Sequence, residues 1–123
     1  MIVSDLERSA EFYRHLGLQF PAPVDPDGHG HTEAQPVGGI TLMLDTRETI
    51  LEFAPAWTPS TGGHAMAMAF NCETAAGVDA TFAELLTAGG SAHHEPWDAV
   101  WGMRYAQVKD PDGNVLDLYA PGQ

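Results

Sequence analysis

The sequence predicts an α+β fold, and three observations support this prediction. Short segments rich in strand-forming residues recur along the chain, separated by turn residues that include many of its 13 Gly and 9 Pro. Two other stretches, 4–16 and 75–88, instead carry apolar residues at helical spacing. The order strand, helix and three strands occurs twice, so 123 residues are expected to form one domain of two similar modules.

The first module is expected to span residues 1–46. After a short strand at 1–3, Ser4 and Glu7 match a capping box that begins a helix. This helix is expected to end near Leu16, because Gly17 suits the left-handed conformation of a helix C-terminus. Three strands are predicted after it, forming an antiparallel meander against which the helix buries one face: 18–24, 31–37 and 40–44.

Residues 47–63 are expected to connect the modules, since they contain Pro55, Pro59 and the pair Gly62-Gly63. The second module then spans residues 64–121. Its predicted helix, 75–88, stops at Gly89-Gly90 and carries Val78, Phe82, Leu85 and Leu86 on its apolar face. The strands expected around it are 64–72, 91–95, 103–109 and 115–119.

Local similarity supports the duplication. Ala10-Glu11-Phe12-Tyr13 and Gly17 match Ala83-Glu84-Leu85-Leu86 and Gly90 at a constant offset of 73 residues.

The last two predicted strands are joined by the turn residues Asp110–Asn114, so they are expected to form a hairpin. Alternation along the final strand places Asp117 and Tyr119 on one face, and Leu116 and Leu118 on the other. A carboxylate directed at a surface otherwise suited to burial needs a partner. Asp117 is therefore the position at which chemistry is expected to enter.

Charge and composition exclude several classes of partner. The net charge is −12 and no run of Lys or Arg occurs, which argues against nucleic acid and against an anionic membrane surface. No apolar run is long enough to span a membrane. The single Cys72 forms no internal disulfide, and the first residues lack the basic and apolar regions of a signal peptide. A cytoplasmic protein is expected.

Two segments together resemble a known superfamily. The run Val3–Arg14 followed by Leu16-Gly17-Leu18, and the turn Asp110–Asn114 before an apolar-acidic strand, resemble signatures of the vicinal oxygen chelate superfamily, which includes glyoxalase I, bleomycin-resistance proteins and extradiol dioxygenases. The resemblance covers nearly the whole chain. It implies two βαβββ modules forming a curved, incomplete barrel around a cavity, here with a truncated first strand, and a homodimer as the expected assembly.

The resemblance also implies where a metal would bind. Catalytic members hold a divalent ion with four side chains, one from the first and one from the last strand of each module. By position these fall on Asp117, on Met43, on His64 or Ala65, and on a residue before the start of this sequence. Since a thioether suits soft metals, His64 and Asp117 are the plausible ligands, and the expected cofactor is either none or one divalent metal ion.

Two further polar clusters contain residue types that can bind a metal. His29, His31 and Glu33 alternate along a predicted strand and would share one face, but a solvated edge strand is the favoured interpretation. His93-His94-Glu95 is adjacent rather than alternating, which suits a metal less well.

An aromatic stretch precedes the final hairpin. Trp97 and Trp101 could stack on a planar or apolar ligand, with Arg104 binding its carboxylate or carbonyl. Alternatively, the tryptophans cover the loop and Arg104 pairs with an aspartate: Asp98, Asp110 or Asp112. The sequence leaves both open.

The leading hypothesis is a glyoxalase/bleomycin-resistance-like protein that binds a small organic molecule, without metal or with weak metal dependence. The residues expected to line its cavity are Met43, Trp97, Trp101, Arg104, Asp117 and Tyr119. One alternative is a metal-dependent lyase or dioxygenase in which Asp117 and His64 help to hold the ion. Another is a non-enzymatic interaction module that uses an exposed sheet edge.

Overall fold

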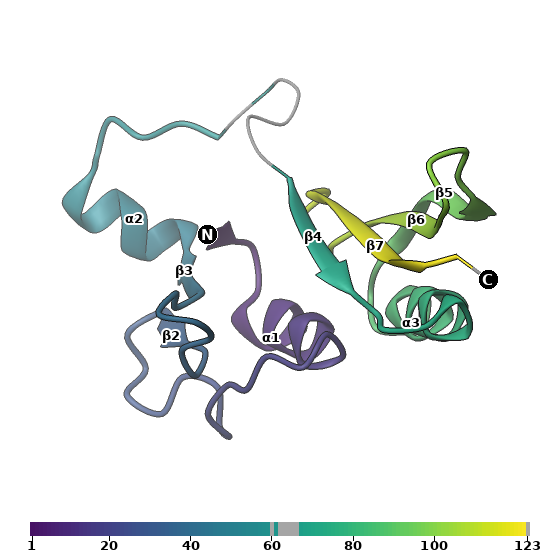
Figure 1. The fold of residues 1–123 in the computed structure, drawn as a ribbon. Coiled ribbons are helices and arrows are strands. Elements are labelled where there is room, and N and C mark those ends of the chain that lie inside the picture. The colour runs from purple at the N-terminus through teal and green to yellow at the C-terminus, as the bar shows by residue number, and fades with distance from the viewer. Residues whose placement is uncertain (60, 62–66, 123) are drawn as a thin grey trace. The chain divides into compact units, whose positions relative to one another are not determined.

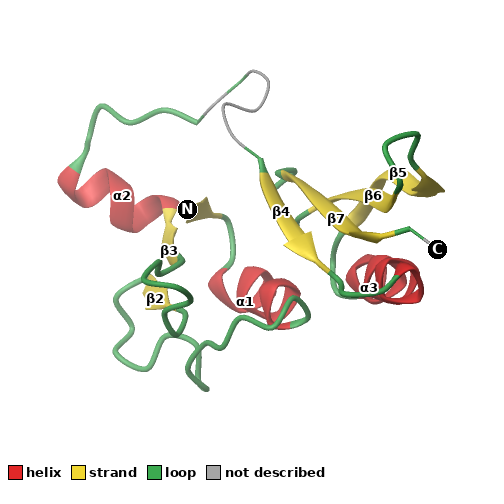
Figure 2. Cartoon of the chain, in the orientation of Figure 1, coloured by secondary structure: helices red, strands yellow, loops and turns green. Residues whose placement is uncertain are grey.

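The computed structural model describes residues 1–59, 61 and 67–122. The chain divides into two compact units, Met1–Gly62 and Gly63–Gln123. Each unit contains its own open sheet and at least one helix, as Figures 1 and 2 show. The α+β class is thus confirmed, while the grouping of both units into one domain stays a prediction.

Unit 1 contains β1 (Ile2–Val3), α1 (Leu6–Arg14), β2 (His31–Glu33), β3 (Met43–Thr46) and α2 (Arg47–Phe53). The strand order is β1-β3-β2, with β1 parallel and β2 antiparallel to β3. The core of this unit lies between α1 and one side of the sheet. Its buried residues are Val3, Leu6, Ala10, Val24 and Leu44.

The first helix begins one residue later than the capping-box prediction. Asp5 is the N-cap, and its carboxylate accepts a 3.0 Å hydrogen bond from the backbone N–H of Arg8. Serine and aspartate are comparable caps, so residue type alone did not separate Ser4 from Asp5. Gly17 has φ of 88°, the left-handed conformation expected at the end of this helix.

The predicted strand 18–24 is wrong, because these residues form no strand in the structure. Pro21 and Pro23 supply no N–H to a ladder. Gln19 of this segment instead accepts a backbone hydrogen bond from Gln35 N at 2.8 Å. Unit 1 therefore has the order βαββα, with β2 shorter than predicted and β3 shifted from 40–44 to Met43–Thr46.

The connecting segment predicted from residue 47 onward begins with a helix, which is a second correction. Thr46 caps α2, accepting a hydrogen bond from the N–H of Thr49 at 3.2 Å. The helix ends at Ala54, immediately before Pro55. Its apolar side chains are not buried: Leu51 is 43% and Phe53 70% exposed.

Unit 2 is a complete βαβββ module containing β4 (Met68–Asn71), α3 (Ala75–Thr87), β5 (Ser91–Asp98), β6 (Met103–Lys109) and β7 (Val115–Pro121). Its strand order is β4-β7-β6-β5, and only β4 and β7 pair in parallel. The helix α3 packs on one side of this sheet, against β5, β6 and β7 (Figure 1).

The interface between α3 and the sheet is apolar. Val78, Phe82 and Leu85 are buried on the helix as predicted, whereas Leu86 is 38% exposed and does not belong to that face. No helix in the described part of the chain is long and apolar enough to cross a membrane.

Candidate functional site

The sheet of unit 2 has two chemically different faces. On β7, Leu116, Leu118 and Ala120 are buried on the side of α3, while Asp117 and Tyr119 alternate to the opposite side and are only partly buried. Alternation along the final strand is therefore as predicted. On β6, Ala106 and Val108 are likewise buried, so Tyr105 and Gln107 lie on the face of Asp117.

Strand register brings these side chains together. Tyr105 lies opposite Tyr119, and Gln107 lies opposite Asp117. On the other neighbour of β6, Trp97 of β5 lies opposite Tyr105. We call this surface the aromatic face, and define it by Trp97, Trp101, Tyr105, Gln107, Asp117 and Tyr119.

The rings of the aromatic face form a continuous chain of contacts. Trp97 and Tyr105 meet edge to face with centroids 5.3 Å apart, and Trp101 lies 5.5 Å from Tyr105 and 6.3 Å from Trp97. Tyr105 and Tyr119 are stacked at 6.5 Å. These separations fall in or near the favourable range for aromatic pairs. Trp101 nevertheless remains 59% exposed, so its ring is available to another molecule.

A tight turn between β5 and β6 positions Trp101. The N–H of Ala99 donates to Met103 O at 2.8 Å, and Gly102, with φ of 88°, donates to Ala99 O at 3.0 Å. Gly122 ties this turn to the end of β7, because its N–H donates to Gly102 O at 2.9 Å. A Cβ at Gly122 would lie 2.6 Å from that oxygen, so glycine is required there.

Asp117 is the hydrogen-bond acceptor at the centre of the polar part of the aromatic face. Its Oδ2 accepts a 2.8 Å hydrogen bond from the Tyr105 hydroxyl, and its Oδ1 accepts a 2.9 Å bond from Gln107 Nε2. Burial raises the pKa of Tyr105 to about 12, assisted by the hydrogen bond and the negative charge of Asp117. The phenol therefore stays protonated at neutral pH and is fixed in orientation.

Comparison with known proteins places this fold. The family model of the glyoxalase/bleomycin resistance protein/dioxygenase superfamily matches residues 1–118. The chain belongs to this superfamily.

Relatives in the superfamily confirm the fold but leave the chemistry open. An uncharacterised protein of Mycobacterium bovis is 29% identical over 98% of this chain and 80% of its own length, and one of Mycobacterium tuberculosis is 29% identical over 98% and 71%. Among solved structures, hypothetical protein SA1046 from S. aureus has a TM-score of 0.78 at 24% identity, covering 98% of this chain and 88% of that one. A glyoxalase/bleomycin resistance protein/dioxygenase family enzyme from Burkholderia phytofirmans has a TM-score of 0.80 at 18% identity, covering 98% and 94%.

Of the positions of the four-ligand metal site implied by the superfamily, the described residues supply one hard ligand. This is the carboxylate of Asp117, whose oxygens accept hydrogen bonds from Tyr105 and Gln107, whereas Met43 offers only a thioether. His64, the other predicted ligand, lies outside the described residues. Within the ranges that the structure describes, no group of three or more His, Cys, Asp or Glu side chains could hold a metal ion.

Arg104 lies on the opposite side of the sheet from the aromatic face. Its Nε and Nη2 donate to the two oxygens of Asp79 on α3, at 2.9 and 3.2 Å, and its Nη1 donates to Asp98 at 3.2 Å. These carboxylates raise the pKa of Arg104, with the Asp79 hydrogen bond as the largest cause. Sequence analysis named Asp98 among the possible partners of Arg104 but did not name Asp79. Arg104 is thus separated from Trp97 and Trp101, with which it had been grouped.

Met43 belongs to unit 1, where it is 44% exposed on β3.

The same sheet carries the His31 cluster. Here β2 is an edge strand, the favoured interpretation of this segment. His31 Nδ1 lies 2.7 Å from Asp45 Oδ1, and its Nε2 lies 3.5 Å from Glu33 Oε2. The hydrogen bond to Asp45 is the main reason that the pKa of His31 is raised. Asp45 was not foreseen as its partner.

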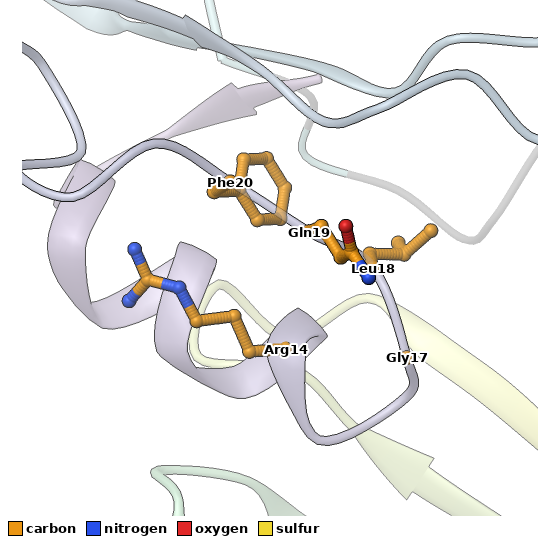
Figure 3. A pocket seen from close by; sticks show the side chains of 5 residues that line it. All are labelled: Arg14, Gly17, Leu18, Gln19 and Phe20. Atoms are coloured by element: carbon orange, nitrogen blue, oxygen red, sulfur yellow. The ribbon is translucent and has the colours of Figure 1, made fainter.

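Unit 1 also has a shallow depression beside α1. It is lined by Arg14 and the residues that follow the helix, Gly17, Leu18, Gln19 and Phe20 (Figure 3). Arg14 donates to Glu7, Glu11 and the carbonyl of Pro21, so its guanidinium is engaged within the unit. The charged group of the depression is thus already engaged by residues of the unit itself.

Sequence analysis missed two residues of the aromatic face and the contact that a third residue makes with it. Tyr105 and Gln107 were not proposed as site residues, although alternation from Asp117 and the hairpin register would have placed them beside it. His94 was considered only as a metal ligand, yet its ring lies 3.9 Å from that of Trp97.

Proposed function

We propose that the aromatic face binds a small organic molecule that contains a planar ring. The observation that supports this proposal is the chain of four aromatic rings beside Asp117, on the side of the sheet that α3 does not cover. Exposed aromatic surface of this kind is typical of contact sites, because each stacked or edge-on ring pair contributes about 0.5–1.5 kcal/mol. The membership of the superfamily agrees with this proposal but does not select a ligand.

The roles of the residues follow from their positions. Trp101 and Trp97 supply the stacking surface, with Trp101 as the more exposed of the two. Tyr105, Gln107 and Asp117 form a hydrogen-bonded polar set that orients a ligand at one end of this surface. Binding is the proposed activity, and turnover is not part of the proposal.

Tryptophan fluorescence tests the proposal. The chain contains Trp57, Trp97 and Trp101, so a Trp57→Phe background leaves only the two tryptophans of the aromatic face. We expect saturable quenching by members of an aromatic fragment set, and loss of binding in Trp101→Ala. Val100→Ala is the matched control, because Val100 is adjacent and fully exposed. Unchanged affinity in Trp101→Ala would contradict the proposed site.

A metal-dependent lyase or dioxygenase is the outcome that would replace this proposal. Metal analysis of the protein purified without a histidine tag, followed by thermal shift with added divalent ions, distinguishes the two. A stoichiometric ion that is lost in Asp117→Ala would favour the metal-dependent alternative.

We also propose that the protein is cytoplasmic and that it forms a homodimer, the assembly that the superfamily resemblance implies. The assembly is tested by size-exclusion chromatography with light scattering. A dimer mass across a dilution series supports the proposal, and a stable monomer would contradict it.

A further inference from the structure

The negative charge of Asp117 lacks a cationic partner on the aromatic face. Its two hydrogen-bond donors, the Tyr105 hydroxyl and the Gln107 amide, are both neutral groups. No ion pair to Asp117 occurs within the part of the chain that the structure describes. The protein therefore fixes the orientation of the Asp117 carboxylate through hydrogen bonds, but no described cation balances its charge.

The positive side chains of the protein are few, and none of them pairs with Asp117 in the part of the chain that the structure describes. The chain has only five Lys and Arg residues. Arg104, the closest in sequence to Tyr105, pairs with Asp79 and Asp98 on the other side of the sheet. Lys109 lies two residues beyond Gln107 on β6, and therefore on the same side of the sheet, but it forms no described ion pair with Asp117. Among the described ion pairs, the negative charge of Asp117 is thus not balanced by a cation of the protein.

The two neighbouring donors are directed at Asp117. The Tyr105 hydroxyl and one N–H of Gln107 Nε2 donate to its carboxylate, so a ligand carboxylate placed there would meet the negative charge of Asp117. Like charges at such close range repel. A neutral ring that lacks a hydrogen-bond donor can stack, but it gains nothing from Asp117.

A ligand with positive charge gains from both parts of the face. The faces of Trp and Tyr rings carry partial negative charge and attract ammonium and similar groups within about 6 Å of the ring centroid. The ring of Tyr105, whose hydroxyl donates to Asp117, is in contact with the rings of Trp97, Trp101 and Tyr119. The net charge of −12 adds a long-range attraction for cations.

We infer that the aromatic face is selective for organic cations, in which a quaternary ammonium or ring-nitrogen cation lies over the aromatic rings beside Asp117. This inference rests on the proposed function and specifies the chemical class of its ligand. It makes Asp117 a charge-selecting residue of the binding face.

Three probes of nearly equal shape test the inference by isothermal titration calorimetry at a mildly alkaline pH. They are N-methylquinolinium, the neutral 4-methylquinoline and the anionic quinoline-4-carboxylate. We expect the cation to bind about tenfold more tightly than the neutral probe, and the anion to bind most weakly. Added salt is expected to reduce the difference between cation and anion.

Asp117→Asn removes the charge but keeps an acceptor oxygen. We expect it to reduce the advantage of the cationic over the neutral probe to the part that the aromatic rings and the net charge supply. Asp79→Asn, which removes one charge on the α3 side of the same sheet, is expected to preserve the cation preference. The ranking of the three probes on the unaltered protein provides the test even where a variant fails to fold.

The outcomes separate the two proposals. A neutral or anionic probe that binds as tightly as the cation would overturn the charge selectivity while leaving the ring-binding function standing. A cation preference that is undiminished in Asp117→Asn would overturn the role of Asp117. Failure of all three probes to bind would contradict the proposed function itself.

Discussion

The hydroxyl of Tyr105 donates a 2.8 Å hydrogen bond to Oδ2 of Asp117 on the neighbouring strand. The two residues are diagonal neighbours, because Tyr105 lies opposite Tyr119 while Asp117 lies opposite Gln107. This bond fixes both the ring that touches Trp97 and Trp101 and the carboxylate beside it. The same aspartate that the superfamily resemblance suggested as a metal ligand therefore serves here to organise an aromatic surface.

Replacing Asp117 with asparagine should lower the pKa of Tyr105. The hydrogen bond to the carboxylate and its negative charge both raise this pKa, so their removal shifts the titration below its value of about 12. It should still remain above 10.0, because burial is the largest cause and is unchanged. Carbon-13 NMR of the tyrosine ring carbons across an alkaline titration measures the shift. An unchanged midpoint would contradict the assigned bond.

The same group predicts how stability depends on alkaline pH. A tyrosine whose folded pKa is above its unfolded value binds its proton more tightly in the native state, so its contribution is complete below pH 10.0. This contribution should be lost as the pH rises from 10.0 toward about 12. Urea unfolding across this window is expected to show a steeper decline for the unaltered protein than for Tyr105→Phe. Identical slopes would contradict the prediction.

Arg104→Gln should leave ligand binding unchanged within about twofold, since no ligand on the aromatic face reaches a side chain directed toward Asp79 and Asp98. A lower unfolding midpoint is expected, with a smaller loss at high salt because the pairs are partly screened. The measurement is the affinity of Arg104→Gln for an aromatic probe, with Trp101→Ala measured in parallel. A loss of binding equal to that of Trp101→Ala would return Arg104 to the ligand site.

Asp110→Ala should destabilise unit 2 by about 2–3 kcal/mol, because a buried carboxylate that accepts several hydrogen bonds is removed. Asp110 is 3% exposed and accepts from the backbone of Asp112, and from the backbone and side chain of Asn114. Chemical unfolding measures the loss. Asp27→Ala is the matched control, since it removes an exposed carboxylate from a turn in unit 1. Equal effects of the two changes would contradict a structural role for Asp110.

Asp45→Asn should lower the pKa of His31, since the Asp45 hydrogen bond is the main cause of its elevation above 6.5. The raised folded pKa makes the His31 contribution to stability complete below 6.5, and this contribution is lost as the pH rises through the folded value. NMR titration of the imidazole checks the shift, and unfolding on either side of pH 6.5 checks the linkage. Asp27→Asn serves as the control for removing one negative charge.

Local sequence signals predicted the elements that depend on short-range chemistry. Gly17 ended the first helix because its left-handed conformation is needed there, and the turn Asp110–Asn114 joined two strands whose bounds at Met103–Lys109 and Val115 were correct. The strand at 18–24 failed because two prolines remove donors that pairing needs. The helix α2 was not predicted, because Pro55 and the turn residues after it favoured a connecting segment over the whole of 47–63. Thr46 is nevertheless a suitable N-cap for this helix.

The candidate site was predicted only where alternation had been applied. It placed Asp117 and Tyr119 together, whereas the hypothesis that grouped Arg104 with the tryptophans did not use the alternation of the predicted strand 103–109. In the structure Arg104 and Tyr105 are consecutive residues of β6 and therefore lie on opposite faces. The partner Asp79 is 25 residues away in sequence and on α3, a pairing that only the packed fold reveals.

The indole N–H signals of the three tryptophans test the central claim most directly. In a two-dimensional proton-nitrogen NMR titration with N-methylquinolinium, the signals of Trp97 and Trp101 should shift in a saturable manner. The signal of Trp57, which does not belong to the aromatic face, is the internal comparison. Trp101→Ala should abolish the saturable shift of Trp97. Shifts confined to Trp57, or a Trp97 titration that is unchanged in Trp101→Ala, would contradict binding at the aromatic face.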